Sequence, residues 1–497
     1  MYLSKSKYTR ALQCPKMLWM DMHKPSEAVD NSTLQEIFER GTDVGDLARS
    51  YFGEYSLVPH SDKKSFMIEE TQKLIEEGVT IIAEASFAYN GNFCSVDILR
   101  KTPCGWEMYE VKSSTELKDV YLDDIAYQCY VLKNCGINLT GIYNMHLNSN
   151  YVRNGELDIK QLFTVEDCSE AVFMRLPYVE QNIQQIEQFF ARTEDYEPEY
   201  DIGMHCEKPY ICAYKNYCQR NLPTPNVFDI NSRYKKALKY QLYHEGIITF
   251  EDVLANKEKA RLNKKQQLQV ETEVFNKPPT VNKIELQKFL DSLTYPLYNL
   301  DFETYMQGVP LYDGIWAYRQ IPFQYSLHIQ KEKGGECEHR EHLGKEGTDT
   351  RRALAEQLCA DIPMNVCSLA YSSQFERRII RELAVDYPDL SEHLMNIHDN
   401  IIDLAKPFQK FDYYCKEFYG RYTIKLVLPA MCPNDPELDY HNLEQIQNGG
   451  DASTTFAKLH TKSPEEIAIT RKNLLAYCGL DTLAMVKVLE KLYEIVE

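Results

Sequence analysis

Three residues in the first quarter of the chain have the types and spacing to act on a phosphate ester. Glu110 and Lys112 lie two apart in a Glu-Val-Lys run, and Asp97 precedes Glu110 by thirteen residues. Alternate strand residues share a face, so Glu110 and Lys112 are expected side by side. Two carboxylates then hold a metal that polarises the phosphoryl group, while Lys112 stabilises charge or orients the attacking water. Glu84, as a further metal ligand, and Gln128, as a further catalytic residue, are expected to be accessory groups.

A second set of acids begins about two hundred residues further on. Asp301 and Glu303 lie two apart in a strand-like run, so they face the same side. Tyr477 and Asp481 lie four apart in a helix-like run and share one helical face. Carboxylates in such arrangements hold hard divalent cations, here Mg²⁺ or Mn²⁺. The separation of the two sets predicts two active sites in two domains.

Four cysteines form a third candidate group. Cys14 lies near the N-terminus, and Cys206, Cys212 and Cys218 follow one another at six-residue steps. The chain has fifteen cysteines and no signal-peptide pattern, so we expect thiols and metal ligands rather than disulfides.

Composition sets the class of protein. The 497 residues are 44% hydrophobic and 26% charged, which is typical of a soluble globular protein with two to four domains. No apolar run reaches the length of a membrane span, so we expect a cytoplasmic protein without membrane contact. The net charge of -19 argues against a generally basic nucleic-acid binder, but carboxylates that bind metal contribute to it.

The elements that must position these residues follow from hydrophobic periodicity and turn signals. In the N-terminal part, helices are expected over 33–52, 66–76 and about 120–133, and strands over 80–87, 93–99 and 106–112. The Asn90-Gly91 pair predicts a hairpin turn between the first two strands. In the C-terminal part, strands are expected over 295–304, 323–329 and 366–371, a helix from about 374, and a last helix that carries Tyr477 and Asp481.

The N-terminal motif resembles the RecB-like branch of the PD-(D/E)XK nuclease family. The resemblance rests on Asp97, the Glu110–Lys112 run and Gln128 in the following helix. It implies a restriction-endonuclease-like α/β domain, assigned to residues 1–224. One departure is that many members carry a metal-binding His where this chain has Gly45, with Asp46 as a candidate substitute.

The cysteines are similar to the iron–sulfur staple of the same nucleases, with one N-terminal cysteine and three after the nuclease core. This resemblance implies a [4Fe–4S] cluster on Cys14, Cys206, Cys212 and Cys218. A structural Zn²⁺ site, with His205 or His23 as a substitute ligand, is the alternative, and unligated core cysteines are a third reading.

The C-terminal acids resemble the Tyr-type branch of the DEDD exonucleases, which implies an RNase H-like α/β domain over 293–497. Motif II is altered, because Ser372 and Glu376 stand where Asn and Asp are usual, and Asp403 fits an additional acid. The resemblance implies two-metal hydrolysis from a 3′ end, in which Tyr477 orients or deprotonates water. The expected metal ligands are Asp301, Glu303, Glu376, Asp403 and Asp481.

The order of these parts is similar to that of an uncharacterised bacterial family over nearly the whole chain, with a mainly helical connector at 225–292. The leading prediction is a metal-dependent nuclease that acts on DNA, with single strands or ends as candidate substrates, in repair, recombination or defence. A helicase or another repair or defence protein is the expected partner. The alternative is an iron–sulfur platform that binds nucleic acid, with one or both nuclease sites degenerate.

Overall fold

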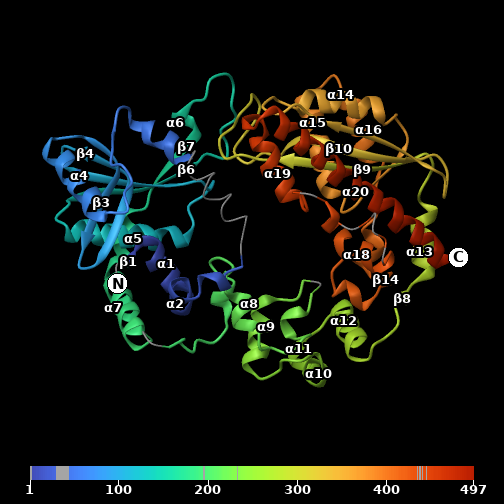
Figure 1. The fold of residues 1–497 in the computed structure, drawn as a ribbon, viewed down its shortest axis with the longest axis horizontal. Helices are drawn as coiled ribbons and strands as arrows, with labels where there is room; N and C mark the ends of the chain where they lie inside the picture. Colours follow the sequence, from blue (N-terminus) through green and yellow to red (C-terminus); the bar gives the residue numbers. More distant parts are fainter. Residues whose placement is uncertain are drawn as a thin grey trace. The chain divides into compact units, whose positions relative to one another are not determined.

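The chain folds into two compact units in the computed structural model (Figure 1). Unit 1 comprises Met1–Asn221 and Gln307–Tyr318, and unit 2 comprises Leu222–Met306 and Arg319–Glu497. The structure describes residues 3–29, 44–193, 196–231, 233–433, 435, 438, 440–443 and 445–497. Both units are α/β structures built on mixed sheets.

Unit 1 is built on a seven-stranded sheet in the order β2-β3-β4-β5-β6-β7, with β1 paired to β4. The neighbours β3, β4 and β5 are antiparallel, whereas β5 and β6 are parallel. Its strands are β1 (Leu3–Ser4), β2 (Ser56–Leu57), β3 (Ile81–Tyr89), β4 (Asn92–Thr102), β5 (Gly105–Lys112), β6 (Leu139–Leu147) and β7 (Phe163–Asp167). Its helices are α1 (Lys5–Gln13), α2 (Pro15–His23), α4 (Lys64–Glu76), α5 (Asp119–Asn134), α6 (Ile159–Leu162), α7 (Ser169–Arg192) and α8 (Lys215–Gln219).

The strands and helices expected around the first motif are present, with ends shifted by a few residues. Asn90 and Gly91 both have positive φ, 45° and 78°, as the tight turn between β3 and β4 requires. Residues 44–49 are helical, and the rest of the expected helix over 33–52 lies partly outside the described residues. Helix α5 packs against β3 and β4 and against α1 and α7 (Figure 1). This packing holds the helix that carries Gln128 against the strand that carries Asp97.

Residues 225–292 form short helices that belong to unit 2. The helices are α9 (Lys236–His244), α10 (Phe250–Ala255), α11 (Lys257–Ala260), α12 (Lys264–Val274) and α13 (Lys283–Asp291). Helices α9 to α12 surround a small apolar core of their own, which includes Leu242, Phe250 and Val270. Capping boxes at Thr249 and Asn263 begin α10 and α12 by satisfying free backbone N–H groups.

The main sheet of unit 2 has the order β11-β10-β9-β12-β13. Strands β11, β10 and β9 are antiparallel, and β9, β12 and β13 are parallel. The strands are β9 (Leu297–Tyr305), β10 (Ile321–Gln330), β11 (Cys337–Leu343), β12 (Cys367–Ala370) and β13 (Ile401–Asp403), and β8 (Thr280–Val281) pairs with β14 (Tyr413–Tyr414). The helices are α14 (Arg351–Asp361), α15 (Gln374–Asp386), α16 (Ser391–Asp399), α17 (Lys406–Lys410), α18 (Ile424–Met431), α19 (Gly449–Lys458) and α20 (Pro464–Val496).

The side chains of strand β9 point alternately to the two faces of this sheet. Tyr298, Leu300 and Phe302 belong to the apolar core that includes residues of α14 and α15. The alternate residues Asp301 and Glu303 therefore face the other side, where α20 packs on β9 and β10. Two strand acids are thus directed toward a helix, which is the arrangement expected for the second motif.

No helix within the described ranges combines the length and apolar character needed to cross a membrane.

Candidate functional site

The acids of unit 2 gather between β9, α15, β13 and α20. One ligand atom each from Asp301, Glu303 and Cys478 lies within 4.8 Å of the others. The charge of Asp481 acts on both Asp301 and Glu303, and Glu376 interacts with both as well. Asp403 acts on Glu376 and joins the set from β13. We call the residues Asp301, Glu303, Glu376, Asp403 and Asp481 the carboxylate cluster.

Burial and mutual repulsion disfavour the ionised form of the acids in this cluster. Loss of water contact, with the charge of Asp481, raises the pKa of Glu303 to about 8. Burial, with the charge of Asp403, raises the pKa of Glu376 to about 8 as well. The pKa of Asp301 is raised well above its usual range by desolvation and by Asp481 and Glu303. The arrangement therefore favours either bound protons or bound cations.

Glu376 takes its place through helix periodicity. It shares the buried face of α15 with Ile379, Ile380 and Leu383. Its Oε2 is buried and has no hydrogen-bond partner among the described residues, so this oxygen is free to bind a cation. Ser372, at the expected Asn position, instead donates its backbone N–H to Asp403 Oδ1 at 2.9 Å, with a φ of +63°.

Tyrosines and a lysine border the carboxylate cluster. Tyr440 donates to Asp481 Oδ1 at 2.5 Å, and Tyr477 also donates to this carboxyl group. Lys425 Nζ lies 4.8 Å from the ring centre of Tyr440 and 5.1 Å from that of Tyr477. Its positive charge lowers the pKa of Glu303 and so partly offsets the repulsion. Cys478, which follows Tyr477 in the sequence, is buried, and its Sγ lies 3.7 Å from Asp301 Oδ2.

The first motif of unit 1 is held in a dense hydrogen-bond network. Lys112 Nζ donates to Glu110 Oε1 and to Asp124 Oδ2, both at 2.7 Å. Gln128 Nε2 donates to Glu110 Oε2 at 2.7 Å. Lys5, from α1, adds a second ammonium 2.9 Å from Glu110 Oε1. Lys5 and Asp124 were not predicted as residues of this site. Asp124 lies four residues before Gln128 on one helical face, and Lys5 belongs to a Lys-Ser-Lys cluster that suggests phosphate binding but not a contact with Glu110.

The two acids of this motif differ in their electrostatics. Burial alone would raise the pKa of Glu110, but the ammonium groups of Lys112 and Lys5 hold it well below its usual range. Desolvation and the charge of Glu110 raise the pKa of Asp97 to about 7. Asp97 Oδ2 accepts the Val111 backbone N–H at 2.6 Å. A charged and a protonatable carboxyl group thus lie together beside Lys112.

Glu84 and Asp46 are both paired with one arginine. Arg49 donates to Asp46 Oδ1 at 2.6 Å and to Glu84 Oε1 at 2.9 Å. Glu84 has a φ of +57° and acts on the pKa of Asp97, so it lies at the edge of the site. A Cβ at Gly45 would meet no atom within 4 Å. This position therefore has room for a larger side chain, such as the His that the family resemblance leads one to expect.

The four predicted cysteines line one narrow cavity of about 10 Å³. Burial raises the pKa of Cys14 to about 12 and that of Cys212 to about 11, and interactions among the thiols add to the shift. Among the described residues, no three of these sulfurs lie within 4.8 Å of one another. His205 also lines the cavity, whereas His23 stacks on Trp19 at 4.3 Å and contacts its carbonyl oxygen.

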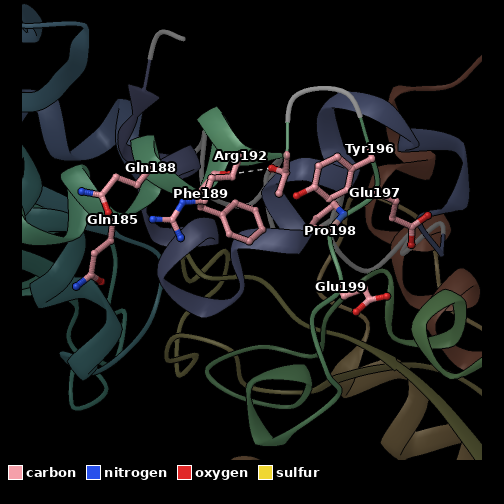
Figure 2. Close-up of a pocket in the computed structure, with 9 residues that line it drawn as sticks. Gln185, Gln188, Phe189, Arg192, Tyr196, Glu197, Pro198 and Glu199 are labelled. Atoms are coloured by element: carbon pink, nitrogen blue, oxygen red, sulfur yellow. Dashed lines mark hydrogen bonds between the residues drawn. The ribbon is translucent and has the colours of Figure 1, made fainter.

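A separate hollow of about 540 Å³ lies where α7 ends (Figure 2). Gln185, Gln188 and Arg192 come from α7, and the segment Tyr196–Glu199 supplies the other side. Glu197 accepts Lys16 Nζ at 2.8 Å and Lys24 Nζ at 2.7 Å, which ties this segment to α2. The contacts give the hollow a structural role beside the cysteine cavity.

Comparison with known proteins gives one match. Residues 298–423 match a domain family described as Domain of unknown function (DUF2779). The matched segment contains Asp301, Glu303, Glu376 and Asp403 and ends before Tyr477. No curated protein and no solved structure matches the chain.

Proposed function

We propose that the protein is a metal-dependent nuclease that hydrolyses phosphodiester bonds in DNA, with unit 2 as the main catalytic unit. The observation that carries this proposal is the carboxylate cluster. Burying several ionised carboxylates together is costly unless cations neutralise them. Divalent Mg²⁺ or Mn²⁺ suits an all-oxygen ligand set, and two such ions stabilise both the attacking and the leaving oxygen of a phosphate ester. The strand order β11-β10-β9-β12-β13 supports an RNase H-like assignment for this unit.

The residues around the cluster have distinct tasks in this proposal. Asp301 and Glu303 on β9, Glu376 on α15 and Asp481 on α20 would hold the cations. Burial and the charge of Asp481 hold the pKa of Tyr477 far above its usual range, so its phenol keeps its proton. Cations bound to Asp301, Glu303 and Asp481 would offset the charges that raise this pKa, so we propose that Tyr477 orients or deprotonates the attacking water. Lys425 lies beside both tyrosines and supplies positive charge for a substrate phosphate.

For unit 1, we propose a RecB-like PD-(D/E)XK site in a restriction-endonuclease-like domain. Asp97, Glu110, Lys112 and Gln128 are the residues that would act there, and the β4–β5 pairing and α5 bring them together. Asp97 and Glu110 would hold the cation there; in the metal-free protein the pKa of Asp97 is raised to about 7, so a cation that binds near neutral pH would displace its proton.

One observation favours a second role for unit 1. Both oxygens of Glu110 are already engaged, Oε1 by Lys5 and Lys112 and Oε2 by Gln128. A carboxylate so fully neutralised has less to offer a cation. The alternative for unit 1 is therefore a nucleic-acid-binding platform whose metal site is degenerate.

We propose that Cys14, Cys206, Cys212 and Cys218 hold a [4Fe–4S] cluster that joins the two ends of unit 1. Four thiols around one cavity support this proposal. A structural Zn²⁺ site on the same residues, with Zn–S bonds of about 2.3 Å, is the alternative. Iron and acid-labile sulfide measured in anaerobically purified protein test this, and stoichiometric zinc without iron would contradict it.

The test of the proposed function is degradation of single-stranded DNA labelled at either end, with Mg²⁺ or Mn²⁺, alongside the same sequence as RNA. Wild type, Lys112→Ala and Asp301→Ala are compared, with the exposed Glu392→Gln in unit 2 as a control. Asp301→Ala is expected to abolish 3′-end degradation. Loss of a separate cleavage activity in Lys112→Ala indicates a working site in unit 1. Absence of cleavage by folded, metal-loaded wild type on DNA and RNA refutes the proposal.

A further inference from the structure

Helix α15 presents a second functional face opposite Glu376. Gln374, Arg377, Arg378 and Arg381 follow one another at positions i, i+3, i+4 and i+7, so they form one stripe along the helix. Together with Phe375 and His398 they line a hollow of about 560 Å³ that is open to solvent. We call this hollow the arginine groove.

Two arginines of this groove, Arg378 and Arg381, are not engaged in ion pairs with described residues. Of the described residues, no carboxylate forms an ion pair with Arg378 or Arg381, and both side chains are exposed. Other arginines of unit 2 are paired: Arg351 with Asp349 and Arg352 with Glu356, both at 2.7 Å. Arg261 and Arg421 also lack an ion pair among the described residues, but only in the groove do two unpaired guanidinium groups line one hollow beside a third. In a chain of net charge -19, this concentration of positive charge favours an anionic ligand.

The groove also offers a surface for bases. The Arg378 guanidinium lies 5.3 Å from the ring centre of Phe375, which is itself partly exposed. An aromatic ring beside arginines is the combination that single-stranded nucleic-acid sites use, with bases stacked on rings and phosphates held by guanidinium groups. An isolated phosphate pocket would not require the ring.

Chain geometry connects the groove to the carboxylate cluster. Arg377 follows Glu376 directly, and its guanidinium donates to the carbonyl oxygen of Ile401. Ile401 begins β13, and the third residue of that strand is Asp403 of the cluster. The groove and the cluster thus share α15, with Glu376 on one face of the helix and the arginines on the other, and the Arg377 hydrogen bond links the groove to β13.

We infer that the arginine groove binds the phosphate backbone of the nucleic-acid strand whose end is hydrolysed at the carboxylate cluster. This inference deepens the proposed function and rests on it for the identity of the reaction. Arginines fix the register of a strand through its phosphates without reading its sequence. The groove therefore provides affinity and processivity, not base preference.

The test compares the full-length variant Arg378→Gln/Arg381→Gln with Lys331→Gln/Arg352→Gln, which removes the same charge from elsewhere on unit 2. Binding of fluorescent single-stranded DNA is measured by anisotropy in EDTA over a range of salt concentrations. The groove variant is expected to bind at least tenfold more weakly at low salt, and its slope of log K against log salt is expected to shrink by about 1.4, from about 0.7 per lost phosphate contact. The control variant is expected to match wild type.

Two further measurements separate the possible outcomes. Hydrolysis of a small diester, thymidine 5′-(p-nitrophenyl phosphate), is expected to be unchanged in the groove variant, while KM for single-stranded DNA rises. Arg378→Lys/Arg381→Lys is expected to keep the salt slope, which shows that lost charge and not misfolding weakens binding. Equal DNA affinity and slope in wild type and groove variant overturn the inference, as does selective loss of binding to phosphatidylserine vesicles. If wild type hydrolyses neither substrate, the proposed reaction fails, but the anisotropy result still decides whether the groove binds a strand.

Discussion

Removal of one charge from the carboxylate cluster is expected to stabilise the metal-free protein. The perturbation is Asp301→Asn, which keeps the size of the side chain. Ligand atoms of Asp301 and Glu303 lie within 4.8 Å of each other. At an effective dielectric constant of about 20, two unit charges at that distance repel by about 3 kcal/mol. The folded wild type avoids this repulsion only by retaining a proton, at a cost that grows as pH rises, and the variant has neither the repulsion nor this cost.

The effect must depend on pH in a defined direction. The pKa of Asp301 is raised in the folded protein, and that of Glu303 is raised to about 8. Below a pH of about 4 these groups are protonated in both folded and unfolded chains, so no penalty arises. Between about pH 4.5 and 8 the folded protein retains protons that the unfolded chain has released, so wild-type stability falls as pH rises. The gain in the variant is therefore large at pH 8 and small at pH 5.

The assay is urea unfolding in EDTA at pH 5 and pH 8, with hydrogen exchange of β9 and β10 peptides to isolate unit 2 from unit 1. At pH 8 the free energy of unfolding of Asp301→Asn is expected to exceed that of wild type by up to about 3 kcal/mol. Saturating Mn²⁺ is expected to reverse the order, because wild type gains more from cation binding. Glu392→Gln serves as the exposed control. A variant that is no more stable than wild type at pH 8 refutes the account of the cluster.

Three other changes have defined expected outcomes. Lys5→Gln removes one of two ammonium groups from Glu110 and is expected to tighten Mn²⁺ binding in unit 1 by about tenfold, measured by calorimetry; weaker binding would show that Lys5 assists the metal. Tyr477→Phe is expected to lower kcat by about 10²-fold or more with unchanged Mn²⁺ affinity, and an effect confined to KM would contradict a role in orienting water. Cys206→Ser is expected to lose bound iron and to speed hydrogen exchange in α1 and α2, because Cys14 would no longer be joined to the distant cysteines; unchanged exchange would argue against a staple.

Local pattern was sufficient to predict the elements that carry the site. The strands at 80–87, 93–99 and 106–112 and the turn at Asn90-Gly91 follow from side-chain alternation and from a residue pair that tolerates positive φ. The same alternation predicts that Asp301 and Glu303 share a face. The hydrophobic pattern repeats every two residues in a strand and every 3.6 residues in a helix. It is visible within a few residues of chain, so a single sequence is enough to detect it.

Contacts between distant segments could not be predicted in this way. Lys5 reaches Glu110 across 105 residues, and Lys425 reaches Tyr477 only once α18 and α20 are packed. Cys478 passed unnoticed because a lone cysteine in an apolar helix reads as core. Arg378 and Arg381 repeat on one face, but only the folded protein shows that they have no acidic partner among the described residues.

The assignment of Gln307–Tyr318 to unit 1 has a consequence for the order in which the chain becomes a working protein. Tyr318 donates to the carbonyl oxygen of Ser113, just after the Glu110–Lys112 run, and Arg153 donates to Leu311 at 2.9 Å. After residue 221 has been synthesised, the ribosome must add about a hundred more residues before this segment is complete, which takes roughly 5–20 s at ordinary rates of synthesis. During that delay unit 1 lacks the segment Gln307–Tyr318, which is encoded within the sequence of unit 2. A protein truncated after residue 221 lacks this segment altogether. The two activities are therefore best separated by point substitution and not by truncation.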